Sequence, residues 1–148
     1  MKTITIILLS LLFAKSCDSK AQQDLKNTNV EYTASTRGYY QHIVITNQTI
    51  AVSSERDSKT IPTATKISTA DWKILVDEFQ KLKLDNIKDL VAPSDKRTYD
   101  AAAFAHLKIM HHEKEYVSND FDNGNPPADI AKFTNKITEI AKKIKTQQ

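Results

Sequence analysis

Residues 30–54, VEYTASTRGYYQHIVITNQTIAVSS, carry the clearest fold signal in this 148-residue chain. Apolar and polar side chains alternate at its start, a pattern typical of a half-buried strand. Aromatic and β-branched residues then dominate, and these favour further strands. Glycine and amide residues supply the turns between them. The predicted strands occupy residues 30–34, 39–46 and 49–54, with turns at Arg37-Gly38 and Asn47-Gln48.

Two amphipathic helices are expected after these strands. Ser68 can cap a helix whose first turn holds Asp71, and Pro126-Pro127 suits the start of a last helix. In both segments apolar residues recur at spacings of three and four, as in a helix with one buried face. The two stripes are Trp72, Leu75, Phe79 and Leu82, and Ile130, Phe133, Ile137, Ile140 and Ile144.

A second hairpin is expected between the two helices. Its strands occupy residues 99–110 and 115–118, and its turn residues 111–114. A short strand within residues 60–66 and a turn of helix at 84–90 are also expected. The order β-β-β-α-β-β-α places the chain in the α+β class. Because hairpins give antiparallel neighbours and both helices need an apolar surface, we expect one antiparallel sheet with both helices packed on one face.

The start of the chain has the anatomy of a bacterial lipoprotein signal peptide. Lys2 gives a positive start, residues 4–14 form an apolar run, and Ser16 is a small residue before Cys17. The run is shorter than the ~20 residues that span a bilayer. Cys17 is the only cysteine, which excludes an internal disulfide. We expect a signal peptide over residues 1–16 and a lipid anchor on Cys17; a plain secreted protein, cut elsewhere, is the alternative.

The remaining chain is expected to have two parts. Residues 17–29 begin with the lipidated cysteine and continue as a flexible tether, because they are polar and almost without apolar side chains. Residues 30–148 have the length of one domain, which we expect to be monomeric. These expectations place the protein in the bacterial cell envelope, attached to a membrane and facing the periplasm or the cell surface.

Composition excludes several classes of function. Removal of residues 1–16 takes away two lysines and no acid, which leaves 19 basic and 18 acidic side chains and a net charge of +1. Such a balance gives no reason to expect a nucleic-acid partner. Gly38 and Gly124 are the only glycines, whereas phosphate-binding loops and the serine-hydrolase elbow need several. No cofactor is expected, and because no catalytic constellation is visible we do not expect an enzyme.

The adjacent histidines His111 and His112 are the candidate metal ligands. In a strand they would point to opposite faces, but in a turn they could converge on a metal ion. No cysteine, aspartate or third histidine follows at ligand spacing, although Glu113 and Glu115 are near. A solvated hairpin turn is therefore the favoured interpretation, and a metal site is the alternative.

The loop over residues 120–125 resembles a calcium-binding loop only in part. It lacks the glycine position and the bidentate glutamate of an EF-hand. Asn123-Gly124 is expected to turn the chain instead, and Asn125 to cap the last helix.

Candidate binding residues cluster around the first turn. Arg37, Tyr39 and Tyr40 combine aromatic rings with a guanidinium, a combination favoured at binding surfaces. The alternative is that the tyrosines pack within the sheet and the arginine is only exposed.

Two segments, YTASTRGYY at 32–40 and FDNGNPP at 121–127, resemble segments of small bacterial envelope lipoproteins of unknown function. The resemblance covers about residues 30–145. It implies an envelope location and a single domain, but no activity, substrate or catalytic residue. If both segments are functional, Asp122 and Asn125 join the candidate binding residues.

These observations favour a membrane-tethered, non-enzymatic interaction module. It would bind an envelope protein or another envelope component through a face of the sheet or through the turn at residues 37–40. One alternative is a lipoprotein that binds a small ligand or a metal through His111, His112 and nearby acids. An enzyme is the third possibility.

Overall fold

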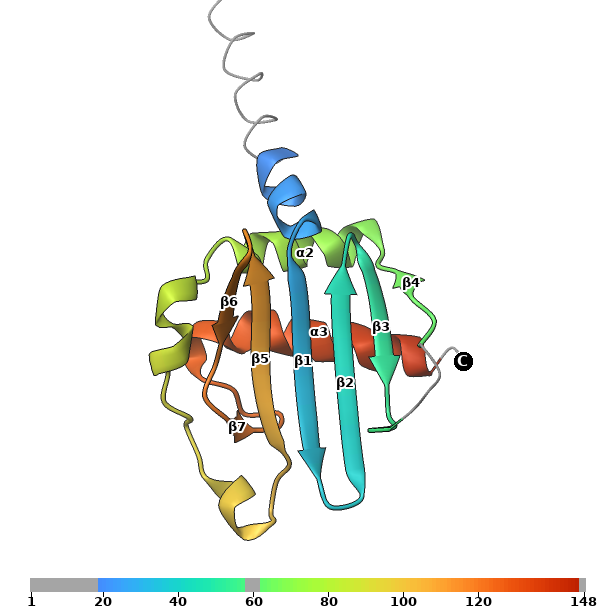
Figure 1. Ribbon diagram of the computed structural model, residues 1–148. Coiled ribbons are helices and arrows are strands. Elements are labelled where there is room, and N and C mark those ends of the chain that lie inside the picture. Colours follow the sequence, from blue (N-terminus) through green and yellow to red (C-terminus); the bar gives the residue numbers. More distant parts are fainter. Residues whose placement is uncertain (1–18, 58–61, 147–148) are drawn as a thin grey trace, which may run out of the picture.

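The computed structural model describes residues 19–57 and 62–146. Its centre is a seven-stranded antiparallel sheet in the order β4-β3-β2-β1-β5-β6, with β7 paired to β5 (Figure 1). The strands are β1 (Asn29–Thr36), β2 (Tyr39–Thr46), β3 (Thr49–Ser53), β4 (Thr65–Lys66), β5 (Phe104–His111), β6 (Lys114–Val117) and β7 (Phe121–Asp122). The prediction of an α+β protein with an antiparallel sheet is confirmed.

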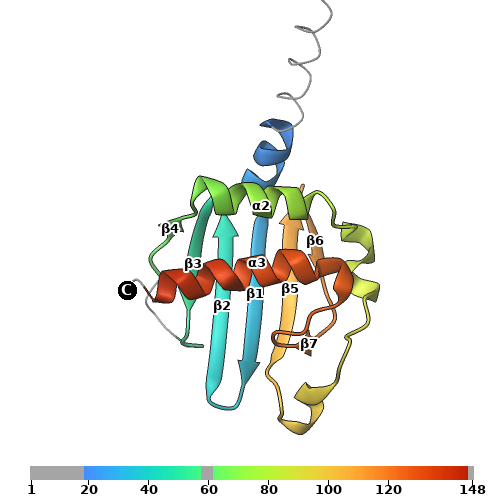
Figure 2. The ribbon, with the colours of Figure 1, turned by 180° about the vertical axis from the view of Figure 1, so that it is seen from behind.

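Both long helices cover the same face of the sheet. Figure 1 shows α2 (Thr69–Phe79) and α3 (Ala128–Lys145) behind the strands, and Figure 2 shows them in front. Their apolar stripes and alternate side chains of the strands form one hydrophobic core. In the described ranges no helix covers the opposite face of the sheet. The core therefore lies on one side of the sheet only, as expected from the two amphipathic helices.

The tight turns follow from local backbone chemistry. Gly38 has a φ of 80° and Gly124 a φ of 87°, which residues with a side chain rarely adopt. Asn47 and Gln48 have φ values of 48° and 61° in the turn from β2 to β3. Positive φ at both central residues matches the right-handed twist of the flanking strands. The predicted turns at these positions are confirmed.

The region between the two long helices differs in part from the expectation. The predicted turn of helix is the 3-10 helix η1 (Leu84–Asp89). The strand predicted from residue 99 begins only at Phe104, because η2 (Lys96–Tyr99) and a left-handed Asp100 occupy the preceding positions. Of the strand predicted over residues 60–66, the described part contains only β4.

Helix α2 begins where the sequence predicts. The Ser68 hydroxyl accepts a hydrogen bond from the Asp71 backbone N–H at 3.1 Å. The Asp71 carboxylate also receives the Lys136 ammonium of α3 at 2.7 Å. The hydrogen bond from Lys136 lowers the pKa of Asp71, and this acid therefore ties the start of α2 to α3.

Replacement of Ser68 with alanine is expected to lower the free energy of unfolding by about 1 kcal/mol, because a backbone N–H in the first turn loses its acceptor. Asparagine is an equally good capping residue, so Ser68→Asn should retain most of that stability. Urea denaturation of both variants checks this expectation. Equal losses in the two variants would contradict a capping role.

The expectation of a flexible tether is wrong for the part of it that the structure describes. Residues 19–26 form a helix that precedes β1. Leu25 is 1% exposed, and Ala21 and Leu25 both belong to the hydrophobic core. Because these two apolar side chains share one face of the helix, packing against the sheet and its helices orders a segment whose composition is otherwise polar.

The signal peptide predicted over residues 1–16 and the lipidation predicted at Cys17 lie outside the described residues. Within the described ranges, none of the helices combines the length and the apolar character needed to cross a bilayer.

Candidate functional site

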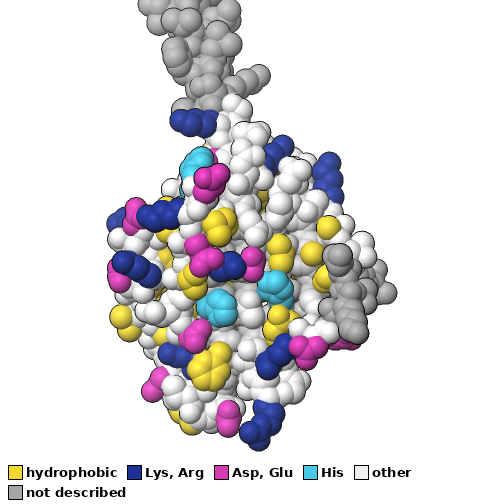
Figure 3. Space-filling view, in the orientation of Figure 1, with side chains coloured by type: hydrophobic (Ala, Val, Ile, Leu, Met, Phe, Trp, Pro, Cys, Tyr) yellow, Lys and Arg dark blue, Asp and Glu magenta, His cyan; other side chains and the backbone are white. Residues whose placement is uncertain are grey.

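The face of the sheet opposite the helices is the largest surface that the strands present to solvent, and we call it the open face. In each strand the residues that alternate with the buried ones point to this side. Figure 3 shows the molecule from this side, with apolar, charged and histidine side chains intermixed. The open face consists of Glu31, Thr33, Ser35, Tyr40, His42, Val44, Ala51, Ser53, Phe104, His106, Lys108, Met110, Glu115 and Val117.

The register of three strands aligns these side chains in rows. Ser35 of β1 lies opposite both Tyr40 of β2 and Phe104 of β5. In the next row Thr33 lies opposite both His42 and His106. The strand pairing therefore places Ser35 between two aromatic rings and Thr33 between two imidazole rings.

Apolar side chains on the open face are accessible to a partner. Phe104 is 41% exposed and Val117 is 37% exposed, whereas Tyr40 is half-buried. The Arg56 guanidinium lies 5.6 Å from the centre of the Tyr40 ring, which is within cation–π range. Aromatic rings beside a guanidinium are typical of the residues that contribute most to protein–protein binding.

The charged groups of the open face pair with one another. The Glu31 carboxylate lies 3.3 Å from His42 Nε2 and 3.5 Å from Lys108 Nζ. Lys108 also lies 3.7 Å from Glu115, and His106 lies 3.4 Å from Asp120 at the margin. A partner would therefore meet a face on which the acidic side chains lie beside a lysine or an imidazole.

The predicted cluster around the first turn is divided by the pleat. Tyr40 lies on the open face, but Tyr39 points to the helix side, where its hydroxyl donates to Gln41 at 3.2 Å. There Tyr39 and Tyr32 line an open hollow of ≈ 680 Å³ beside α3. Arg37 is exposed at the turn itself. Because neighbouring residues in a strand face opposite ways, the three predicted residues do not form one site.

Tyr32 closes the floor of that hollow. Its hydroxyl donates to Asn123 Oδ1 at 2.7 Å, and the residue is buried. Burial raises the pKa of the Tyr32 phenol, and the nearby Tyr39 raises it further. The phenol therefore stays protonated and links β1 to the loop that precedes α3.

Asp122 and Asn125 hold two loops together. The Asp122 carboxylate is 2% exposed and accepts four hydrogen bonds. Two come from side chains, Ser94 Oγ at 2.5 Å and Arg97 Nη1 at 3.1 Å. The other two come from the backbone N–H groups of Lys96 and Arg97, at 2.9 Å each. Asn125 donates to Ser94 Oγ at 2.6 Å. The binding role predicted for these two residues stays a prediction, because their contacts are internal to the fold.

Asn125 does not cap the last helix, and that prediction is wrong. The residue that precedes α3 is Pro127, and no side chain makes a capping hydrogen bond at the N-terminus of this helix. The Asn125 amide points instead to Ser94.

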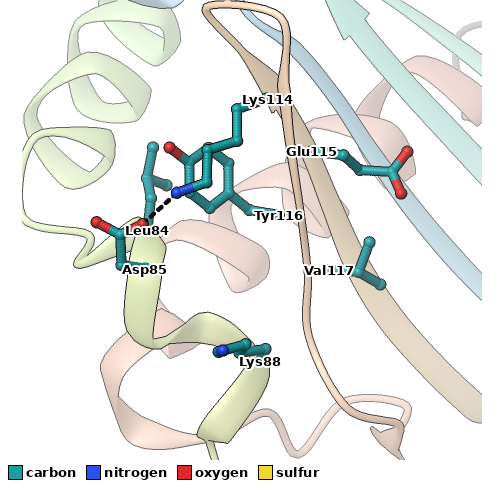
Figure 4. Close-up of a pocket in the computed structure, with 7 residues that line it drawn as sticks. All are labelled: Leu84, Asp85, Lys88, Lys114, Glu115, Tyr116 and Val117. Atoms are coloured by element: carbon teal, nitrogen blue, oxygen red, sulfur yellow. Dashed lines mark hydrogen bonds and ion pairs between the residues drawn. The ribbon is translucent and has the colours of Figure 1, made fainter.

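A small cavity lies between β6 and η1, as Figure 4 shows. Its volume is ≈ 220 Å³, and its mouth is bridged by Lys114 Nζ, which contacts Asp85 Oδ1 at 2.6 Å. The hydrogen bond from Lys114 lowers the pKa of Asp85. Asn119 donates to the backbone carbonyls of Lys88 and Leu90 further along the same edge. These contacts indicate that η1 protects the free edge of β6.

The two adjacent histidines lie away from the open face. His111 ends β5 and His112 begins the turn to β6. Their Nε2 atoms lie 3.7 Å and 3.4 Å from Oδ1 of Asp24, which belongs to the helical segment 19–26. Asp24 is not among the residues predicted from sequence, because only the packing of that segment on the domain brings it to the histidines.

Comparison with known protein-family models and with curated proteins yields no match for this chain. Function must therefore be inferred from the surfaces described above.

Proposed function

We propose that this protein is a non-enzymatic interaction module of the bacterial cell envelope, tethered to a membrane through Cys17, and that a protein partner docks on the open face of its sheet. The observation that carries the proposal is the open face itself. It combines exposed apolar and aromatic side chains with charges that pair among themselves.

The shape of the open face favours a protein over a small molecule. Sites for small molecules are concave. The hollow beside α3 and a third one around the loops at Ser94 and Asn125 contain no open-face residue, and the small cavity between β6 and η1 reaches this face only at its margin, through Glu115 and Val117. An exposed sheet surface with apolar anchors in a polar surround has the composition of a protein–protein interface.

The size of the open face also suits a protein partner. A strand of eight residues is ~26 Å long, and five neighbouring strands span ~20 Å. This area is of the same order as the ~800 Å² that each partner contributes to a standard interface.

Attachment to the membrane would give the module a defined location. Several acyl groups on one cysteine suffice for stable anchoring, whereas one chain alone does not. The lipid anchor, the envelope location, the monomeric state and the lack of a nucleic-acid partner stay predictions from the sequence.

Site-specific photocrosslinking in living bacteria tests the proposal. A photoreactive amino acid at Thr33, in the middle of the open face, is expected to yield a discrete crosslinked protein. The same amino acid at Lys132, on the exposed side of α3, should not capture that protein. Cys17→Ala should remove the adduct, because it removes the proposed anchor. Equal capture from both positions, or none from Thr33, would contradict docking on the open face.

Introduction of a negative charge at an apolar residue of the open face gives a quantitative version of this test. Phe104→Glu is expected to reduce the crosslinked fraction roughly tenfold or more, because an exposed aromatic residue that a partner covers contributes strongly to binding. Lys132→Glu is the matched control and should leave the fraction unchanged. Phe104 is partly exposed, so the variant should keep its fold, which circular dichroism can verify. An unchanged fraction in Phe104→Glu would count against the open face as the interface.

A further inference from the structure

Asp24, His111 and His112 bring three metal-ligating side chains to one point. One ligand atom from each residue lies within 4.8 Å of the other two. The two imidazole rings are 4.0 Å apart between centroids, and both Nε2 atoms face the same carboxylate oxygen. The group lies outside the open face, where the helical segment 19–26 meets the β5–β6 hairpin (Figure 1).

Backbone geometry explains why neighbouring histidines converge here. In a regular strand His111 and His112 would point to opposite faces. His112, however, has a φ of 48° and already belongs to the turn, so its ring swings to the side of His111. The φ value of the next residue, Glu113, is also positive, and this tight turn keeps both rings together.

A hydrogen bond with Thr28 fixes which nitrogen of the His111 ring carries the proton. The Thr28 hydroxyl donates its one hydrogen to the Asp24 backbone carbonyl at 2.8 Å. Its 2.8 Å contact with His111 Nδ1 must therefore be a hydrogen bond that it accepts, so Nδ1 carries the proton. In the neutral imidazole this leaves the lone pair on Nε2, which faces the Asp24 carboxylate.

A cation satisfies this arrangement. In the neutral tautomer the Nε2 lone pair and the carboxylate oxygen face each other at 3.7 Å and repel, and either a proton on Nε2 or a bound metal ion relieves that repulsion. In most metal-binding histidines, the ring nitrogen that does not bind the metal donates a hydrogen bond to a nearby acceptor, which fixes the tautomer and the orientation of the ring. The hydrogen bond from His111 Nδ1 to Thr28 corresponds to this arrangement. The Phe79 ring packs edge-on against the His111 imidazole, with ring centroids 5.6 Å apart, and this contact restricts the orientation of the imidazole.

We propose that His111 Nε2, His112 Nε2 and Asp24 Oδ1 bind one Zn²⁺ ion, with solvent in the fourth position. Imidazole nitrogen and carboxylate oxygen are common zinc ligands, and three protein ligands plus water form a common open coordination. Ligand atoms bound at about 2.0–2.1 Å to a tetrahedral ion lie roughly 3.3–3.4 Å apart. The 3.4 Å and 3.7 Å separations from Asp24 are close to that geometry.

Zinc bound here would join two elements of the fold. Asp24 comes from the helical segment 19–26 and the histidines come from the β5–β6 hairpin, so the ion would fasten that segment to the domain. This role is independent of docking on the open face.

Titration of the purified full-length protein, in mild detergent, with zinc chloride tests the proposal. Isothermal titration calorimetry is expected to show one bound ion, and the Tm should rise with zinc concentration by mass action. The two ligand variants are His112→Asn, since asparagine tolerates positive φ, and Asp24→Asn. Each should weaken zinc binding tenfold or more. The double variant His42→Gln/His106→Gln removes two histidines from the open face and should bind like the wild type.

Each result has a defined meaning. Weaker binding in both ligand variants, with unchanged binding in the double variant, supports the site. The proposal is overturned if the wild-type protein binds no zinc, if the ligand variants bind as tightly as the wild type, or if the double variant loses binding to the same extent. His112 is 76% exposed at its side chain, so loss of folding would not explain a weaker affinity in that variant.

Discussion

Replacement of Asp122 with alanine is expected to lower the Tm by roughly 10 °C or more, because it breaks a buried ion pair and leaves the remaining donors without an acceptor. The carboxylate accepts from Ser94, from two backbone N–H groups and from the Arg97 guanidinium. Arg97 is itself only 16% exposed at its side chain, so its charge would stay largely enclosed without this partner. Differential scanning fluorimetry measures the change.

Two controls separate this network from a general effect of removing an acid. Asp120 is more than half exposed and pairs with His106 at the margin of the sheet, so Asp120→Ala should change the Tm by only a few degrees at most. Ser94→Ala removes one donor and should have an intermediate effect. Similar losses from Asp120→Ala and Asp122→Ala would argue against a central role for the Asp122 network.

The pH dependence of stability provides an independent check on the same residue. Burial by itself raises the pKa of Asp122, but the hydrogen bonds from Ser94, Arg97 and Lys96 outweigh it and hold the pKa well below its ordinary range. A depressed pKa in the folded state stabilises the protein above the unfolded pKa of about 3.9, and the effect fades as pH falls further. The stability difference between wild type and Asp122→Asn should therefore be constant above about pH 5 and shrink below pH 4. A difference that grows on acidification would contradict this linkage.

Replacement of Leu25 with alanine is expected to lower the free energy of unfolding by about 2–5 kcal/mol, as for other large-to-small changes in a packed core. Leu25 is 1% exposed although it precedes the first strand. We therefore expect the segment 19–26 to unfold together with the domain. Urea denaturation followed by the fluorescence of Trp72, the only tryptophan and a core residue, measures the loss.

Gln23→Ala on the exposed side of the same segment is the matched control and should cost less than about 0.5 kcal/mol. If residues 19–26 behaved as a free tether, both variants would unfold at the same urea concentration as the wild type. That result would contradict the packing of this segment on the domain.

Much of the fold was predictable because it depends on neighbours in the sequence. Alternation with period two places Val30, Tyr32 and Ala34 on one side of β1, and spacings of three and four do the same for the apolar faces of α2 and α3. The turn at Gly38 and the cap at Ser68 depend on one residue's backbone freedom or on one short hydrogen bond. Such features need no knowledge of distant partners.

The candidate sites were less predictable because they depend on distant partners. Adjacent tyrosines at the first turn suggested one cluster, but the pleat separates them, and Tyr40 shares its row with Phe104 of a strand far along the chain. The same holds for Asp24, which meets the histidines only through packing of the helical segment 19–26.

Local sequence patterns were enough to predict β1, β2, β3, β5, β6, α2 and α3, their order along the chain, and which face of α2 and α3 would be apolar. Backbone sterics and side-chain periodicity act over a few residues and are legible in any short window. The neighbours of each strand in the sheet, the packing of residues 19–26 into the core and the polar contacts between elements became apparent only from the folded chain. Those contacts depend on how the whole set of apolar surfaces can be buried at once, and no local pattern contains that information.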